Sequence, residues 1–270
     1  AIFTEQSVNG LFLAGVIPGL LSLAGFLLTI LIWAALRPQD APRQADADTT
    51  APGSTLAGLW PALLLFAIVV GGIYTGLFTP TEAAAVSLVT ALAIGLLRRK
   101  ITWANLTEAG SETVRQTAMI FLVAMAAKLF TVFISLTRIT PRALDWLQAI
   151  DPPLVAVIAA IVLFYLVIGM FLDSIGILVL TLPFTVPIMS SYGVDLIWFG
   201  VIVIKLLEIG LITPPIGLNI FVIKSVTPRS VTLAEVFRGA GAFLALDIVV
   251  LGLLLAIPAL SLWLPGTALN

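Results

Sequence analysis

Apolar residues are grouped in long, nearly uninterrupted blocks along this chain. A transmembrane helix needs about 20 mostly apolar residues, whereas helices in soluble cores are rarely that long. Alternation with a period of two is absent, and only helices or closed barrels cross a bilayer. The pattern therefore predicts an all-α, polytopic membrane protein embedded in the lipid bilayer. Five blocks carry this prediction: Leu11–Leu36, Leu59–Leu77, Ala83–Leu97, Thr117–Leu136 and Ala242–Leu264.

The composition supports a membrane protein and excludes several other classes. Of the 270 residues, 60% are hydrophobic and only 10% are charged, whereas about a quarter of the residues in a soluble domain are charged. The sequence has no cysteine and no histidine, which rules out disulfides, thiolate or imidazole chemistry and Cys/His zinc sites. The net charge of −1 argues against a nucleic-acid partner, because such proteins carry basic patches.

The polar segments between the blocks predict how the chain is oriented. Arg37–Thr55 is hydrophilic and rich in proline, alanine and threonine, which is typical of a flexible linker. Basic residues in short loops stay in the cytoplasm, so Arg98–Lys100 places this side of the protein there and both chain ends outside. Ile101–Thr113 is too polar to span and predicts a short amphipathic helix at the cytoplasmic surface, with a solvated loop as the alternative.

Two short motifs predict helix starts. Thr79, Pro80 and Glu82 stand at the N-cap, first and third helical positions, as in a capping box with proline where its missing N–H costs nothing. Thr232 and Glu235 predict the same cap for the last apolar helix.

Several charged residues lie inside apolar sequence, where each costs on the order of 3 kcal/mol on insertion scales. Lys205 and Glu208 are three residues apart on one helical face, so they are predicted to neutralise each other. Lys128 and Asp247 have no oppositely charged residue close by in the sequence. They either pair across helices or face a partner subunit.

Two apolar stretches are interrupted. Residues 153–190 turn at Gly169–Gly176, and each half is short for a full span, which favours a re-entrant hairpin over two short tilted spans. Asp173 in the turn either ligates a cation or caps the returning helix. The helix that starts at Leu196 is interrupted within Glu208–Asn219 by two successive prolines, which remove backbone donors.

The second interruption predicts a cation site. The carbonyls of Gly210–Thr213 lose their helical partners, and in hydrocarbon such groups must be paired or face a wet cavity. Carbonyl, hydroxyl and carboxylate oxygens suit an alkali cation, while half-helix N-termini attract an anionic substrate. A structural proline kink is the alternative interpretation.

A secondary transporter accounts for paired interrupted segments better than the other membrane classes. A serine protease of the membrane would need a GxSG motif and a histidine, and Gly169–Asp173 does not match the GxGD motif of an aspartyl protease. A channel usually needs a filter loop, which is missing. Ser7–Phe12 and Thr232–Phe237 open two long helices with similar residues, a faint sign of an inverted repeat.

Three motifs resemble the large membrane subunit (DctM-like, M subunit) of tripartite ATP-independent periplasmic (TRAP) transporters. Together with the apolar blocks around them they cover nearly the whole chain, which is similar to the C-terminal half of that subunit. The motifs are Gly72–Ala85, Gly169–Asp173 and Glu208–Asn219.

This resemblance implies an inverted-repeat elevator fold with one re-entrant hairpin and one discontinuous helix, in a multi-pass protein of the bacterial inner membrane. It implies a sodium-coupled importer of organic acids rather than an enzyme, with sodium as coupling ion and no other cofactor. The implied partners are a small membrane subunit, a periplasmic substrate-binding protein and the remaining N-terminal half. A carrier that works without a binding protein and a non-transporting scaffold are the alternatives, and the substrate itself is not readable.

By the same resemblance, sodium ligands are expected among Gly169, Asp173, Gly210, Thr213, Pro214 and Asn219. Ser174, Pro215 and Gly217 are expected near the substrate, while Thr79, Pro80 and Glu82 form a structural motif. The expected domains are the last scaffold helix of a first repeat (1–36), a cytoplasmic linker (37–56), scaffold helices with an amphipathic arm (57–113), an arm or transport-domain helix with an outer loop (114–152), the transport-domain hairpin and broken helix (153–226) and a C-terminal scaffold helix (227–270).

Overall fold

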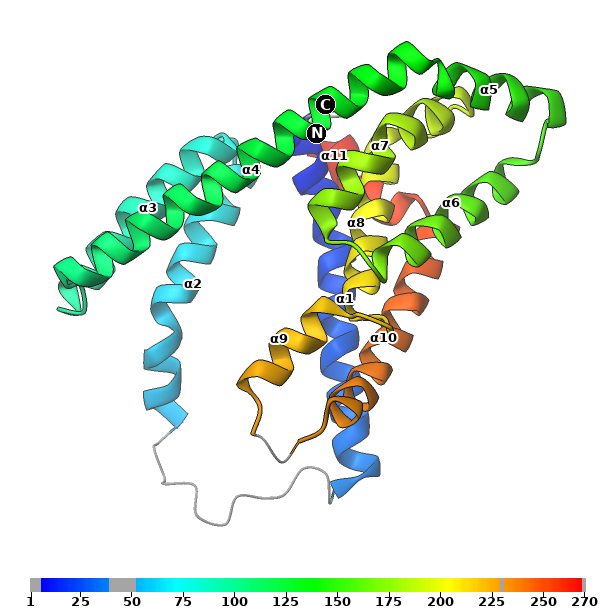
Figure 1. Cartoon of the computed structure of the whole chain (residues 1–270). Coiled ribbons are helices and arrows are strands. Elements are labelled where there is room, and N and C mark those ends of the chain that lie inside the picture. The colour runs from blue at the N-terminus through cyan, green and yellow to red at the C-terminus, as the bar shows by residue number, and fades with distance from the viewer. Residues whose placement is uncertain (1–5, 39–51, 229–230, 269–270) are drawn as a thin grey trace. The chain divides into compact units, whose positions relative to one another are not determined.

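The computed structural model describes residues 6–38, 52–228 and 231–268. Within these ranges the chain is helical and contains no strand, which confirms the all-α prediction (Figure 1). The helices are α1 (Val8–Leu36), α2 (Pro52–Tyr74), α3 (Pro80–Leu97), α4 (Trp103–Thr137), α5 (Ile139–Ile150), α6 (Leu154–Gly169), α7 (Ser174–Ser191), α8 (Leu196–Ile212), α9 (Leu218–Val226), α10 (Leu233–Ala256) and α11 (Ala259–Ala268).

Five of these helices are long and apolar enough to cross a membrane: α1, α3, α4, α7 and α10. Both predicted capping boxes are present. The hydroxyls of Thr79 and Thr232 accept a hydrogen bond from the N–H of Glu82 and Glu235, and each glutamate carboxylate accepts one from the backbone N–H of its cap threonine. α1 begins in a related way, because the Ser7 hydroxyl accepts a hydrogen bond from the Gly10 N–H. Most of the linker Arg37–Thr55 lies outside the described residues.

Two predicted elements differ from the structure. Ile101–Thr113 is helical but does not form a separate short helix; it is the start of α4, which begins where the Thr102 hydroxyl accepts a hydrogen bond from the Asn105 N–H. The last block is not a single helix either. α10 ends at Ala256 and α11 follows, because Pro258 has no N–H to continue the helical bonds.

The chain divides into two compact units, residues 36–120 and residues 1–35 with 121–270. In the first unit α2 packs against α3, and the Arg98 guanidinium lies 5.4 Å from the centre of the Trp60 ring. In the second unit α8 is central and packs against α6, α7, α10 and α11 (Figure 1). More than half of its residues are buried, including Phe199, Val203 and Leu206. This unit therefore has its core around the helix that carries the twin prolines.

The bend between α10 and α11 is stabilised by α8. Pro258 leaves the Leu254 carbonyl without its helical donor, and the buried Trp198 indole N–H donates a hydrogen bond to it at 3.0 Å. The N-terminal end of α8 is thereby fixed to the end of α10.

Trp198→Phe is expected to lower the free energy of unfolding by about 1–3 kcal/mol, because the buried Leu254 carbonyl loses its donor. Trp263→Phe is the matched control, since Trp263 is exposed on α11. Denaturant unfolding of the purified protein in detergent measures both. Equal losses in the two variants would contradict the assigned role of this hydrogen bond.

Candidate functional site

The hairpin predicted at residues 153–190 is present as α6 and α7, joined by a turn of four residues. Asp173 is the N-cap of α7: its Oδ2 accepts hydrogen bonds from the N–H groups of Ile175 at 3.1 Å and Gly176 at 3.2 Å. The capping interpretation of this residue is thus confirmed. The carboxylate is exposed, so its other oxygen is accessible. Whether the hairpin re-enters the membrane from one side stays a prediction.

A buried hydroxyl network holds the two arms of the hairpin together. The Thr181 hydroxyl donates to the Ile177 carbonyl at 2.7 Å and lies 2.6 Å from the hydroxyl of Tyr165 on α6. Tyr165 also lies 3.1 Å from the Thr185 hydroxyl. These three polar side chains are buried and hydrogen-bonded, which gives the turn a rigid base.

The second interruption lies between α8 and α9, at residues 213–217. The peptide bond between Pro214 and Pro215 is cis. Leu211, Ile212 and Thr213 have carbonyls that receive no hydrogen bond from the described residues.

One of the four carbonyls predicted to be free is paired, and that part of the prediction is wrong. The N–H of Thr213 turns back and donates to the carbonyls of both Ile209 and Gly210, at 3.1 Å each. The Thr213 hydroxyl also donates to the Ile209 carbonyl, at 2.6 Å. This tighter last turn satisfies the Gly210 carbonyl, as is common where helices end.

The two interruptions meet at a contact between backbones. A Cβ atom added to Gly210 would lie 2.7 Å from the Cα of Gly169 and 3.0 Å from its carbonyl oxygen. A Cβ atom on Gly169 would lie 3.0 Å from the Cα of Gly210. Both residues are buried, so only glycine allows the end of α6 to approach α8 this closely. The helices that lead into the two interruptions therefore touch at these glycines.

The remaining predicted residues do not converge on one point in the structure. Gly217 adopts a left-handed conformation (φ +61°), and a Cβ atom there would lie 3.2 Å from the Ile212 carbonyl oxygen. Asn219 lines an apolar cavity of about 510 Å³ between α9 and α10. Pro214 and Pro215 are exposed. No hydrogen bond among the described residues joins Asp173 or Ser174 to residues 213–219.

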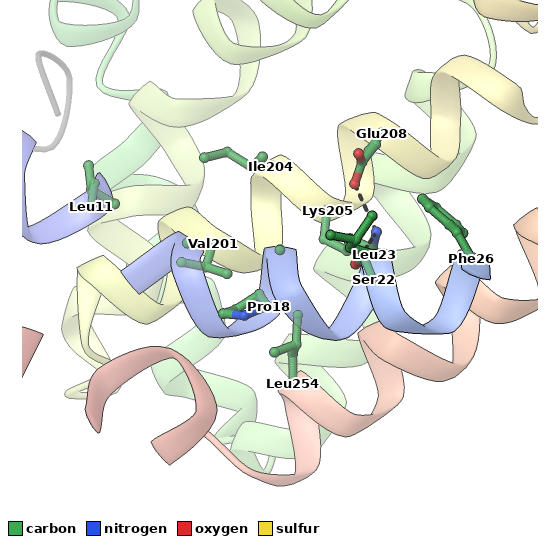
Figure 2. Close-up of a pocket in the computed structure, with 12 residues that line it drawn as sticks. Leu11, Pro18, Ser22, Leu23, Phe26, Val201, Ile204, Lys205, Glu208 and Leu254 are labelled. Atoms are coloured by element: carbon green, nitrogen blue, oxygen red, sulfur yellow. Dashed lines mark hydrogen bonds and ion pairs between the residues drawn. The ribbon is translucent and has the colours of Figure 1, made fainter. Parts of the chain in front are cut away.

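A charged cluster beside α8 was only partly predicted. The Lys205 ammonium contacts Glu208 at 2.8 Å, which confirms that pair (Figure 2). It also contacts Asp247 of α10, at 2.6 Å. Asp247 therefore pairs across helices with Lys205 and not with Lys128, which is exposed on α4. The available signal was two opposite charges, each in the middle of an apolar block. Sequence distance could not join them because they are 42 residues apart.

Interrupted helices whose broken parts meet inside an apolar helical unit are typical of secondary transporters. Residues 1–260 match the family model of the tripartite ATP-independent periplasmic transporter, DctM component. The chain belongs to this family, as the three motifs indicated.

The chain is similar along nearly its whole length to several curated relatives. It is 35% identical over 98% of its residues to the C4-dicarboxylate TRAP transporter large permease protein DctM of Pseudomonas aeruginosa. It is 33% identical over 98% of its residues to the sialic acid TRAP transporter large permease protein SiaM of Vibrio cholerae. It is 30% identical over its full length to the ectoine/5-hydroxyectoine TRAP transporter large permease protein UehC of Ruegeria pomeroyi.

The chain spans about three fifths of the length of these relatives, 62%, 61% and 62% respectively. All three are named as permease proteins of transporters. The chain is accordingly an integral membrane protein of a transporter family and not an enzyme.

Proposed function

We propose that this chain forms the larger part of the membrane subunit of a sodium-coupled secondary transporter in the bacterial inner membrane. It imports an organic acid that a periplasmic binding protein delivers, and it works by an elevator motion. Family membership supports the tripartite system. The relatives are named for solutes as different as C4-dicarboxylates, sialic acid and ectoine, so the solute class is taken from the family and not narrowed further.

The contact between Gly169 and Gly210 carries this proposal. The capped turn, Met170–Asp173, directly follows Gly169, and the unpaired carbonyls of residues 211–213 directly follow Gly210, so the contact brings these two segments near each other. Carbonyl and hydroxyl oxygens in an apolar surrounding suit a bare alkali cation. Sodium would be held by oxygens from Gly169, Asp173, Gly210, Thr213, Pro214 and Asn219, with the substrate beside Ser174, Pro215 and Gly217.

The moving part would include α1 and α10 together with α6–α9. Lys205 and Trp198 tie α8 to these two helices through buried polar bonds, which are costly to break in hydrocarbon. The sequence placed residues 1–36 and 227–270 in the scaffold and residues 153–226 in the transport domain. The proposal departs from that division, because helices joined in this way move most easily as one body.

Uptake by the complete assembly tests the proposed function. The full subunit is reconstituted in liposomes with its small membrane subunit and binding protein, with and without an inward sodium gradient. Solute accumulation that requires both the gradient and the binding protein is expected. Uptake without the binding protein would favour a sodium-coupled carrier that works independently. No uptake under any cation gradient would leave a non-transporting scaffold subunit as the remaining interpretation.

Thr213→Ala and Asp173→Ala are expected to weaken the sodium dependence of uptake without preventing membrane insertion. Each removes an oxygen next to an interruption. Asp173→Ala also removes a helix cap, which costs about 1 kcal/mol of stability. Asp195→Ala is therefore the matched control. Asp195 caps the N-terminus of α8 through two N–H bonds of the same kind, at the end of α8 that lies away from the interruption. Sodium dependence unchanged in both site variants would remove this assignment.

A further inference from the structure

The ammonium of Lys205 joins three helices at one point. Its three N–H groups match three acceptors: Ser22 Oγ on α1 at 3.1 Å, Glu208 Oε2 on α8 at 2.8 Å and Asp247 Oδ1 on α10 at 2.6 Å. The ring of Phe26 on α1 also lies 5.9 Å from the ammonium. Figure 2 shows Lys205 with Ser22, Phe26 and Glu208 beside a cavity of about 400 Å³ between α1 and α8.

Stability alone gives little reason for this cluster. Lys205 is 5% exposed and Asp247 is 0% exposed, and charges buried this deeply are seldom better than apolar residues of similar size. Two carboxylates share one ammonium, and the Asp247 Oδ2 has no hydrogen-bond partner among the described residues. An arrangement that is costly but geometrically specific points to a positional role.

The cluster is well placed to control the contact between the interruptions. Lys205 precedes Gly210 by about one and a half helical turns on the same helix. The residues between them are buried apart from Glu208, so this part of α8 is packed on most sides. The bonds to Ser22 on α1 and Asp247 on α10 fix the height and the rotation of α8, and with them the face that Gly210 presents to Gly169.

We propose that Lys205 is a positioning residue for the cation site: its bonds to α1 and α10 hold Gly210 against Gly169 and so set the sodium affinity, without contact to the ion. The sodium part rests on the proposed function. The positional part rests on the geometry of the cluster alone.

The test uses a variant that keeps the fold. Lys205→Met alone leaves the buried Asp247 without a partner, so the main variant combines it with Asp247→Ala. This removes both buried charges and leaves Glu208, whose side chain is about half exposed. Lys128→Met is the matched control, because Lys128 is an exposed lysine inside apolar sequence. Thermal unfolding of the complete subunit in detergent is expected to be close to that of the unsubstituted protein for both.

Distances between spin labels measure how the turn after α6 is placed relative to the start of α9, which follows α8. The chain has no cysteine, so single cysteines at the exposed positions Phe171 and Leu218 take labels on the two sides of the interruptions. A single narrow distance distribution is expected with Lys205 in place and for Lys128→Met. The double variant is expected to give a broad or shifted distribution at unchanged stability.

Sodium titration of uptake supplies the second measurement. The sodium concentration for half-maximal uptake is expected to rise roughly 3- to 30-fold in the double variant, the range for residues that act on a site through packing. A stable double variant with the original distances and sodium response would overturn the positioning role. Absence of sodium dependence in the unsubstituted protein would refute the proposed function instead, and the label distances would still decide whether Lys205 positions α8.

Discussion

Gly210→Ala is expected to reduce uptake by the complete transporter to the level of liposomes without protein. The added Cβ atom would lie 2.7–3.0 Å from three backbone atoms of Gly169, and backbone cannot rotate aside as a side chain can. Either α6 moves away from α8 or the turn at Met170–Asp173 shifts, and both change the place where the cation and substrate are proposed to bind. Overpacking of this kind also costs about 1–3 kcal/mol of stability.

The same geometry predicts a graded series. Gly169→Ala is expected to be milder, because its Cβ atom would meet the Cα of Gly210 at 3.0 Å and no other atom closer than 3.8 Å. Gly252→Ala on α10 is the control: no atom lies within 4 Å of its Cβ position, so transport should be retained. Uptake is measured per amount of folded protein in the liposomes. Normal transport by Gly210→Ala would show that the contact is not part of the mechanism.

Lys205→Met is expected to lower the free energy of unfolding by about 3–5 kcal/mol, because it leaves the fully buried carboxylate of Asp247 without its cation. Asp247→Ala is expected to cost less, since Lys205 still has Glu208 and Ser22 as acceptors. Unfolding in detergent, with yield from the membrane fraction as a second measure, compares the two.

Asp145→Ala provides the control for the loss of an acidic residue, because Asp145 is exposed on α5. It should leave stability within experimental error. If Lys205→Met unfolded no more readily than Asp145→Ala, the buried ion pair would have no structural consequence, and the assignment of Asp247 as its partner would have to be abandoned.

Local signals predicted helices and their starts. Length and hydropathy identified the long apolar helices, and the capping boxes at Thr79 and Thr232 placed the first residues of α3 and α10. Prolines and glycines located both interruptions, because their effect on the backbone does not depend on what packs nearby. The candidate site follows in outline from these two breaks and from the family resemblance.

Features that depend on contacts between distant residues could not be predicted in this way. The Leu254 carbonyl tolerates the break before Pro258 because Trp198 reaches it from α8. The polar segment before residue 114 continues into α4 because nothing in Trp103–Thr137 breaks the helix, although its polarity changes. From the sequence, Lys205 was paired only with Glu208, and Asp247 had no assigned partner. The two residues meet because α8 packs against α10.

The contact of Gly169 with Gly210 has a consequence for how the solute preference of this chain could be changed. A frame formed by main-chain atoms has the same dimensions whatever side chains surround it. If the proposed site is right, the solute preference of this chain would then depend on the side chains beside the contact and not on the contact itself. Engineering a new specificity should accordingly leave this pair of glycines untouched and vary Ser174 and the residues around Pro215.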